Sequence, residues 1–125
     1  MIEMMNWLKY DAPTLGNHDF EPPTKILKQN ILQSQFSWLV ANISFRNKKH
    51  TLFPPYKIIE RYGVRVGILG LITPVFHLWI DPEQRKGLNF KEMLETAKIC
   101  VKVLHEQEKV DYLIGLFHSW RQHAV

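Results

Sequence analysis

A nearly unbroken apolar run from Val64 to Ile72 constrains the fold of this 125-residue chain more than any other segment. Strands that are covered on both faces have continuous apolar sequences, whereas strands with one wet face alternate between apolar and polar residues. A second strand-like segment, Tyr56–Tyr62, comes directly before it, and Gly63 separates the two. We therefore expect a β-hairpin with a tight turn, in which the second strand is a central strand of its sheet.

Two segments in the first third of the chain have the apolar spacing of helices. Residues 2–9 carry one apolar stripe, formed by Ile2, Met5 and Leu8. The second helix is expected from Thr24, which can cap it, to about Gln33, and its expected inward residues are Ile26, Leu27 and Ile31.

The strongest helical pattern extends from Asn89 to about Glu108. Asn89 and Glu92 have the N-cap and N3 spacing of a capping box. Apolar residues then recur at intervals of three and four, as expected for a helix with one broad buried face; they are Phe90, Met93, Leu94, Ala97, Val101 and Leu104. The single Cys100 falls within this pattern, and we expect it to be a small buried apolar residue.

Three more segments are expected to be strands: Ala12–Leu15, Phe36–Ile43 and Val110–Phe117. The last ends at His118, the kind of strand-terminal position where open α/β sheets bind their ligands. Helices and strands alternate, and no repeat, low-complexity run or linker interrupts them. The predicted fold class is α/β, and residues 1–125 are expected to form one domain or part of one.

Residues that can carry chemistry cluster after the first short strand, in the run Gly16–Asp19 (Gly-Asn-His-Asp) and at Glu21. Asn17 offers a carbonyl oxygen and His118 an imidazole nitrogen, and both suit a divalent cation such as Zn²⁺ or Mn²⁺ if they lie at adjacent strand ends. The alternative is a plain polar turn, with positive φ at its Gly and Asn and a capping Asp, and an ordinary strand-end histidine.

The run and its flanks, residues 10–21, closely resemble the Gly-Asn-His-(Asp/Glu) motif of calcineurin-like metallophosphoesterases, in the 5′-nucleotidase and 2′,3′-cyclic-nucleotide phosphodiesterase branch. Other segments resemble parts of the same family in the same order. They are Met5–Asp11, Val40–Ile43, Val66–Pro74 and Asp111–Ser119. The resemblance extends from Met5 to about Ser119, which is nearly the whole chain.

The resemblance implies the α/β/β/α double-sheet sandwich of that family. Family members supply their first metal ligands from an Asp-x-His and a Gly-Asp motif upstream of this region, and their last from a Gly-His-x-His motif downstream. None of the three motifs occurs in this sequence. We therefore expect the chain to be the central part of a catalytic domain, without its first and last motif segments.

The resemblance also implies a hydrolase of nucleotide phosphate monoesters or cyclic phosphodiesters, with two divalent metal ions and a bridging hydroxide that attacks phosphorus. Asn17 and His118 match the ligands of one ion. His18 matches the histidine that stabilises phosphoryl charge or protonates the leaving oxygen, and Glu21 matches the carboxylate that orients this histidine. The order Asp19-Phe20-Glu21 swaps the two acids of the usual Glu-Phe-Asp, so Glu21 is one methylene longer than expected.

The number of ligands separates two possible functions. A catalytic zinc ion normally has three protein ligands, whereas this chain offers two matched ones. We expect weak metal binding and an inactive isolated chain; the alternative is a non-catalytic remnant that binds a metal or partner weakly. Because strands are missing beside Ala12–Leu15 and Val110–Phe117, exposed edges and self-association are also expected. The residues that bind substrate are not predicted, because in this branch a C-terminal domain mostly holds the nucleoside.

Composition argues against two other classes of partner. The net charge is +4, and its main cluster, Arg46–His50, lies between two strand-like segments without interleaved aromatic residues, so a solvated loop is expected rather than a nucleic-acid surface. No apolar run reaches about 18 residues, and no signal peptide is recognisable, so no membrane partner is expected. The family is mostly exported, and the location of this chain is left open.

Overall fold

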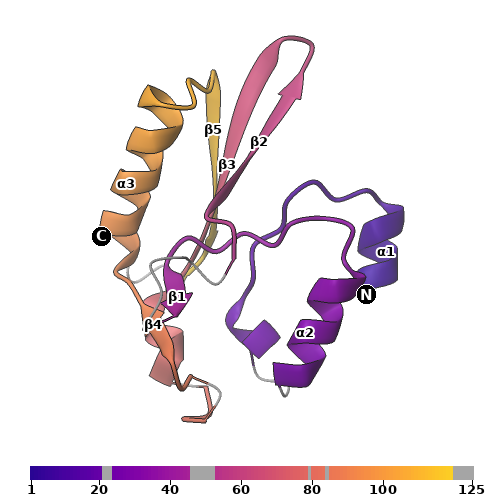
Figure 1. Cartoon of the computed structure of the whole chain (residues 1–125), viewed down its shortest axis with the longest axis vertical. Coiled ribbons are helices and arrows are strands. Elements are labelled where there is room, and N and C mark those ends of the chain that lie inside the picture. The colour runs from indigo at the N-terminus through magenta and orange to yellow at the C-terminus, as the bar shows by residue number, and fades with distance from the viewer. Residues whose placement is uncertain (21–23, 46–52, 79, 84, 120–125) are drawn as a thin grey trace.

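The structure is a computed structural model that describes residues 1–20, 24–45, 53–78, 80–83 and 85–119. Arg46–His50 and Glu21 therefore lie outside the described residues. The elements, in chain order, are α1 (Ile2–Trp7), the 3₁₀ helix η1 (Asn17–Phe20), α2 (Thr24–Gln33), β1 (Ile43–Phe45), β2 (Tyr56–Arg61), β3 (Val64–Ile72), the 3₁₀ helix η2 (Pro74–Leu78), β4 (Leu88–Phe90), α3 (Met93–Glu106) and β5 (Tyr112–His118). They form an α/β fold with two sheets, as predicted (Figure 1).

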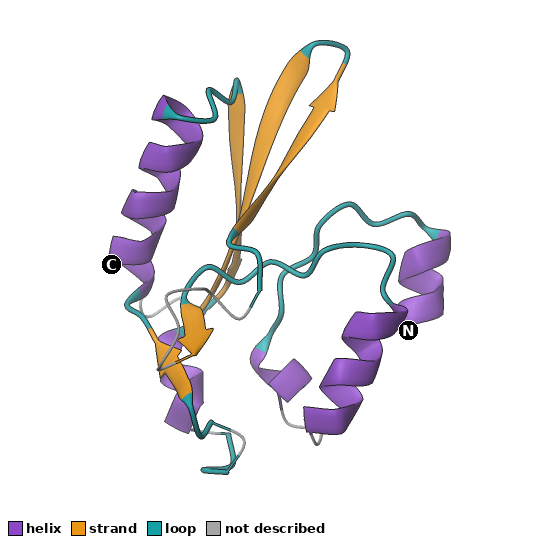
Figure 2. Cartoon of the chain, viewed as in Figure 1, coloured by secondary structure: helices purple, strands orange, loops and turns teal. Residues whose placement is uncertain are grey.

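The main sheet has the strand order β2-β3-β5 and contains the predicted hairpin (Figure 2). β2 pairs antiparallel with β3, from Tyr56 opposite Leu69 to Arg61 opposite Val64. The turn residues Tyr62 and Gly63 both have positive φ, 53° and 78°, which is the backbone that suits a two-residue hairpin turn. β5 pairs parallel with the other edge of β3. β3 is therefore the central strand, as its apolar sequence indicated.

α3 covers one face of this sheet, and the α1–α2 pair lies away from it (Figure 1). The cluster between α3 and the sheet contains Ala41, Leu69, Leu71, Cys100 and Leu104, all buried. The expected burial of Cys100 is thus confirmed, and this burial raises the pKa of its thiol.

The predicted start of this helix is wrong. Its N-cap is Glu92, whose carboxylate accepts the backbone N–H of Glu95 at 2.7 Å; this hydrogen bond lowers the pKa of Glu92. Asn89 and Phe90 belong to β4, where Phe90 pairs with Ile43 of β1. Pairing with a distant strand therefore outweighed the local capping-box pattern.

The predicted inward face of α3 needs a correction as well. Leu94 is 60% exposed and Val101 is 41% exposed. Met93, Ala97 and Leu104 face the sheet as predicted, and Thr96 and Cys100 are buried beside them. The apolar spacing identified the helix, but two of its apolar residues face outward.

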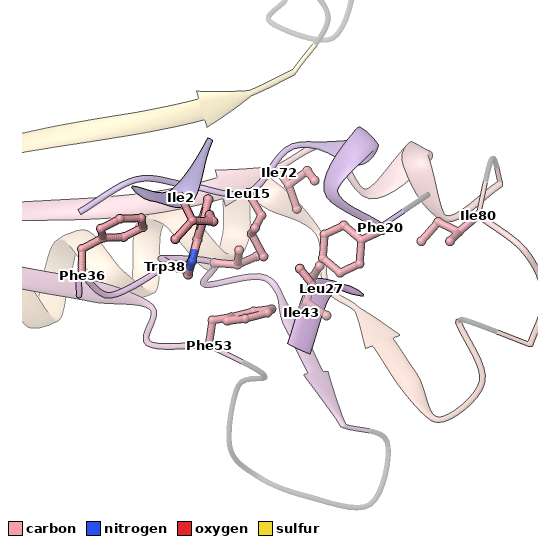
Figure 3. Packing of buried hydrophobic residues seen from close by; sticks show 11 residues of the cluster. Ile2, Leu15, Phe20, Leu27, Phe36, Trp38, Ile43, Phe53, Ile72 and Ile80 are labelled. Atoms are coloured by element: carbon pink, nitrogen blue, oxygen red, sulfur yellow. The ribbon is translucent and has the colours of Figure 1, made fainter. Parts of the chain in front are cut away.

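A second cluster fills the N-terminal part of the molecule, between α1, α2 and the strand ends (Figure 3). Its buried members are Ile2, Leu15, Phe20, Leu27, Phe36, Trp38, Val40, Ile43, Phe53, Ile72 and Ile80. In α2, Leu27 is buried and Ile31 packs against the cluster, as predicted, but Ile26 is 43% exposed. In the predicted 2–9 helix, Leu8 lies just after α1 and is also exposed.

Most of the expected strands Ala12–Leu15 and Phe36–Ile43 is not strand: they share one parallel bridge, between Thr14 and Leu39, and Ile43 is the first residue of β1. Pro13 has no N–H and cannot donate to a ladder, although its carbonyl accepts the N–H of Leu39 at 2.9 Å. The Thr14 hydroxyl donates to the carbonyl of Leu39 at 2.8 Å. A side chain therefore replaces part of the strand pairing here.

Asn42 joins the two sheets. Its side-chain amide donates to the carbonyl of Ile72 at 2.6 Å, and its Oδ1 accepts the N–H of Ile72 at 3.1 Å. Asn42 is fully buried, and such a group must have partners in an apolar core. It thus fixes the end of β3 relative to β1.

Candidate functional site

The Gly16–Asp19 run forms a loop that enters η1, and buried apolar residues hold both of its ends. Leu15, just before the loop, is completely buried, and Phe20, at its end, is 6% exposed. Figure 3 shows both side chains in the N-terminal cluster, with Phe20 near Leu27 and Ile43. The core therefore positions the loop from both sides.

Two hydrogen bonds close the loop. The carboxylate of Asp19 accepts the N–H of Gly16 at 2.8 Å, and the N–H of Asp19 donates to the carbonyl of Gly16 at 3.2 Å. Neither Gly16 nor Asn17 has a positive φ, so the polar turn considered as an alternative is wrong in its backbone, although Asp19 does cap the loop. Asn17 and His18 are presented between these two bonded residues.

His118 reaches the loop from the end of β5. Its backbone pairs with Ile72, and its carbonyl accepts the N–H of Thr73 at 2.9 Å. Its imidazole lies against Gly16, where an added Cβ would meet three ring atoms at 3.0 to 3.2 Å. Because glycine has no Cβ, the ring can approach the loop this closely.

The structure brings the two predicted metal ligands together. Nε2 of His118 lies 2.6 Å from Oδ1 of Asn17, across 101 positions of sequence. The pair is a hydrogen bond when Nε2 carries the proton. Asn17 is half-buried, whereas His18 and His118 are exposed. The predicted partner of His18, Glu21, lies outside the described residues, so this dyad has no described geometry.

The donor types fit a borderline divalent cation. An amide oxygen and an imidazole nitrogen that converge from two elements are acceptable ligands for Zn²⁺ or Mn²⁺. Among the described residues, no group of three His, Cys, Asp or Glu side chains is placed to hold a metal ion. The described part of the chain therefore contributes two converging donors.

Of the residues that hold this pair in place, sequence reasoning identified the capping Asp19, in the polar-turn alternative, but not the roles of Gly16 and Thr73. Asp19 closes the loop, Gly16 admits the His118 ring, and Thr73 holds the His118 backbone. The Gly before the Asn was the available signal for a close approach.

No helix among the described residues has the length and apolarity to cross a bilayer.

The chain is similar in sequence to bacterial proteins that include 5′-nucleotidases, although no family model matches it. The chain is 33% identical over 114 residues to a 5′-nucleotidase of Vibrio cholerae and 32% identical over 114 residues to the silent protein UshA(0) of Salmonella typhimurium. In both cases 91% of this chain matches 21% of the relative.

The fold of the chain is also similar to that of a solved phosphoesterase structure. The calcineurin-like phosphoesterase YfkN from Bacillus subtilis matches with a TM-score of 0.83 and 30% identity, over 94% of this chain and 37% of that one. The chain thus spans about a fifth of the length of the curated relatives named above. Its homologues are 5′-nucleotidases and calcineurin-like phosphoesterases, which are hydrolases, and the chain corresponds to a part of their fold.

Proposed function

We propose that this chain supplies two metal ligands and the catalytic histidine of a metal-dependent phosphohydrolase that acts on nucleotides. The observation that carries the proposal is the 2.6 Å contact between Oδ1 of Asn17 and Nε2 of His118. The two donors come from a loop and a strand end that the fold places side by side. The substrate class, phosphate monoesters or cyclic phosphodiesters of nucleotides, rests on the family.

Each residue has a separate role in this proposal. Asn17 and His118 would hold one divalent cation of a pair, and the pair would supply an activated water as nucleophile and neutralise charge on the phosphate. His18, which follows Asn17 on η1 and is exposed, would stabilise phosphoryl charge or protonate the leaving oxygen. Glu21 would orient His18. Asp19 would hold the loop closed, and Gly16 would leave room for the His118 ring beside it.

We further propose that the chain alone is inactive. Two donors are fewer than the three protein ligands of a normal catalytic zinc site. The small number of metal ligands also favours the second candidate function, a non-catalytic remnant that binds a metal or a partner weakly. The isolated chain should then hydrolyse p-nitrophenyl phosphate no faster than buffer containing the same metal.

Metal titration tests the proposed ligands directly. Zn²⁺ added to the isolated chain should shift the imidazole NMR signals of His118, with weak affinity. His118→Ala should reduce this affinity, and His105→Ala, which removes an exposed histidine of α3, should leave it unchanged. Binding that is indifferent to His118→Ala would contradict the ligand assignment.

A fused protein tests the catalytic role. The chain would be joined to an upstream segment with the Asp-x-His and Gly-Asp motifs and a downstream segment with the Gly-His-x-His motif, the motifs that the family resemblance implies. We expect metal-dependent hydrolysis of a nucleotide, with a loss on the order of 10²-fold or more in His18→Ala. Asn17→Ala should lose activity that excess metal partly restores, and His105→Ala should keep full activity.

The outcomes of this experiment separate the two candidates. A fused enzyme that is active but indifferent to His18→Ala would refute the assigned catalytic histidine. A fused protein that folds and binds metal but never hydrolyses nucleotides would support the non-catalytic remnant.

A further inference from the structure

The last residue of β3 is held at both edges by residues from distant parts of the chain. On one edge Ile72 lies opposite His118 of β5, and the N–H of Thr73 donates to the carbonyl of His118 at 2.9 Å. On the other edge β2 pairs with β3 only as far as Leu69. Ile72 therefore has no strand partner on that edge among the described residues, and the side chain of Asn42 takes that place.

The amide of Asn42 pairs with Ile72 as a peptide group of a neighbouring strand would. Its Nδ2 donates to the Ile72 carbonyl at 2.6 Å, and its Oδ1 accepts the Ile72 N–H at 3.1 Å. Both residues are completely buried, and buried backbone groups need such partners because water cannot replace them. The amide of asparagine offers a donor and an acceptor together. Alanine offers neither, and an ionised aspartate lacks the donor.

The backbone around Asn42 is anchored independently of this contact. The N–H of Ala41 donates to the carbonyl of Gly70 at 2.8 Å, and the N–H of Lys91 donates to the carbonyl of Asn42 at 2.9 Å. The side chain therefore extends from a backbone that is hydrogen-bonded on both sides. It can fix the position of Ile72 rather than follow it.

Ile72 is connected to both elements that carry the proposed metal ligands. Its backbone is in register with His118. Its side chain belongs to the N-terminal cluster, together with Leu15 and Phe20, which hold the two ends of the Asn17 loop (Figure 3). A shift of Ile72 would therefore move the strand end relative to the loop, and the 2.6 Å contact between the two donors depends on that relative position.

We propose that Asn42 is a positioning residue of the metal site, which holds the end of β3 where His118 can reach Asn17. The effect on metal binding rests on the proposed function, whereas the effect on the position of His118 does not need a metal. Both amide atoms of Asn42 are bonded to Ile72, so Asn42 acts through the backbone and is not a third ligand. Hydrogen bonds that orient metal ligands change metal affinity by about 10- to 100-fold.

NMR of the full chain without metal tests the position of His118. Its imidazole lies against Gly16, so the ring should give a nuclear Overhauser effect to the Hα atoms of Gly16. Asn42→Ala should lose this signal. The matched control is Leu104→Ala, which truncates a completely buried side chain that packs over Gly67, near the start of β3. It should lower the stability and keep the signal.

Zn²⁺ titration of the same variants tests the consequence for the site. The affinity should fall by about tenfold or more in Asn42→Ala and stay unchanged in Leu104→Ala. An Asn42→Ala chain that keeps the ring signal would overturn the positioning role, as would equal effects of the two variants on it. Loss of the ring signal, combined with Zn²⁺ binding that is indifferent to His118→Ala, would support the positioning role and refute the assigned ligand instead.

Asn42→Asp is the second variant, for the case that Asn42→Ala does not fold. Its protonated carboxyl is similar in size to the amide and offers one donor and one acceptor, and burial raises the pKa of such a carboxyl. The ring signal should be present while the introduced carboxyl is protonated and disappear when it ionises. The unaltered chain should keep the signal over the same pH range. A signal that persists after the introduced carboxyl ionises would overturn the proposal.

Discussion

β3 and β5 are neighbouring parallel strands of similar apolar sequence, yet their surroundings are opposite. They pair from Val66 opposite Tyr112 to Ile72 opposite His118. Leu71 is completely buried, whereas Phe117, opposite it, is 58% exposed. β3 has a strand on each side and α3 over one face, while β5 has one described neighbour. An apolar sequence thus predicts that both faces of a strand are buried. Whether they are buried depends on the elements that pack beside and over the strand.

The largest expected effect comes from truncating this pair. Leu71→Ala should reduce the free energy of unfolding by about 2–5 kcal/mol, because it leaves a cavity in a closed core. Phe117→Ala should cost less than about 1 kcal/mol, because an exposed substitution leaves no cavity. Denaturant unfolding at a concentration where the chain is monomeric measures both. Equal losses would show that β5 is as well covered as β3.

A smaller contrast is expected at two glycines. An alanine Cβ at Gly70 would lie 2.6 Å from Cβ of Leu39 and 2.7 Å from its backbone carbon, so the main chain must shift, and Gly70→Ala should cost about 1–3 kcal/mol. At Gly115 the added Cβ would meet the ring of Phe117, an exposed side chain that can turn away. Gly115→Ala should therefore cost less than Gly70→Ala in the monomer. The reverse order would contradict the proposed difference in cover between the strands.

The smallest effect is a pH dependence on the covered face of β3. Burial raises the pKa of Cys100, which packs in the cluster with Leu69 and Leu71. The unfolded thiol then releases its proton at lower pH than the folded one, so stability is fully present below the ordinary thiol pKa of about 8.5 and falls as pH rises above it. The free energy of unfolding should fall less from pH 7 to pH 9.5 in Cys100→Ala. An unchanged slope would mean that the thiol is not held neutral by the core.

The candidate site, including the meeting of Asn17 and His118 at one metal ion, was implied by the family resemblance and not by any local sequence signal. The sequence offered Asn17 and His118 as donors without any local reason for them to meet. Their contact depends on β5 pairing with the end of β3, and on the buried residues Leu15 and Phe20 at the ends of the loop. The bracing role of Asp19 depends on the same loop geometry.

The sequence by itself determined the α/β class, the hairpin with β3 at its centre, the presence of α3 and β5, and the burial of Cys100, because apolar periodicity and turn residues are local signals. Only the tertiary structure decided that Asn89 and Phe90 form a strand, that Leu94 and Ile26 face outward, and that Thr14 and Leu39 make a single bridge. Each of these outcomes depends on a partner far away in sequence. A distant strand or core can outweigh local preferences, because burial and pairing contribute more free energy than a cap or one helical position.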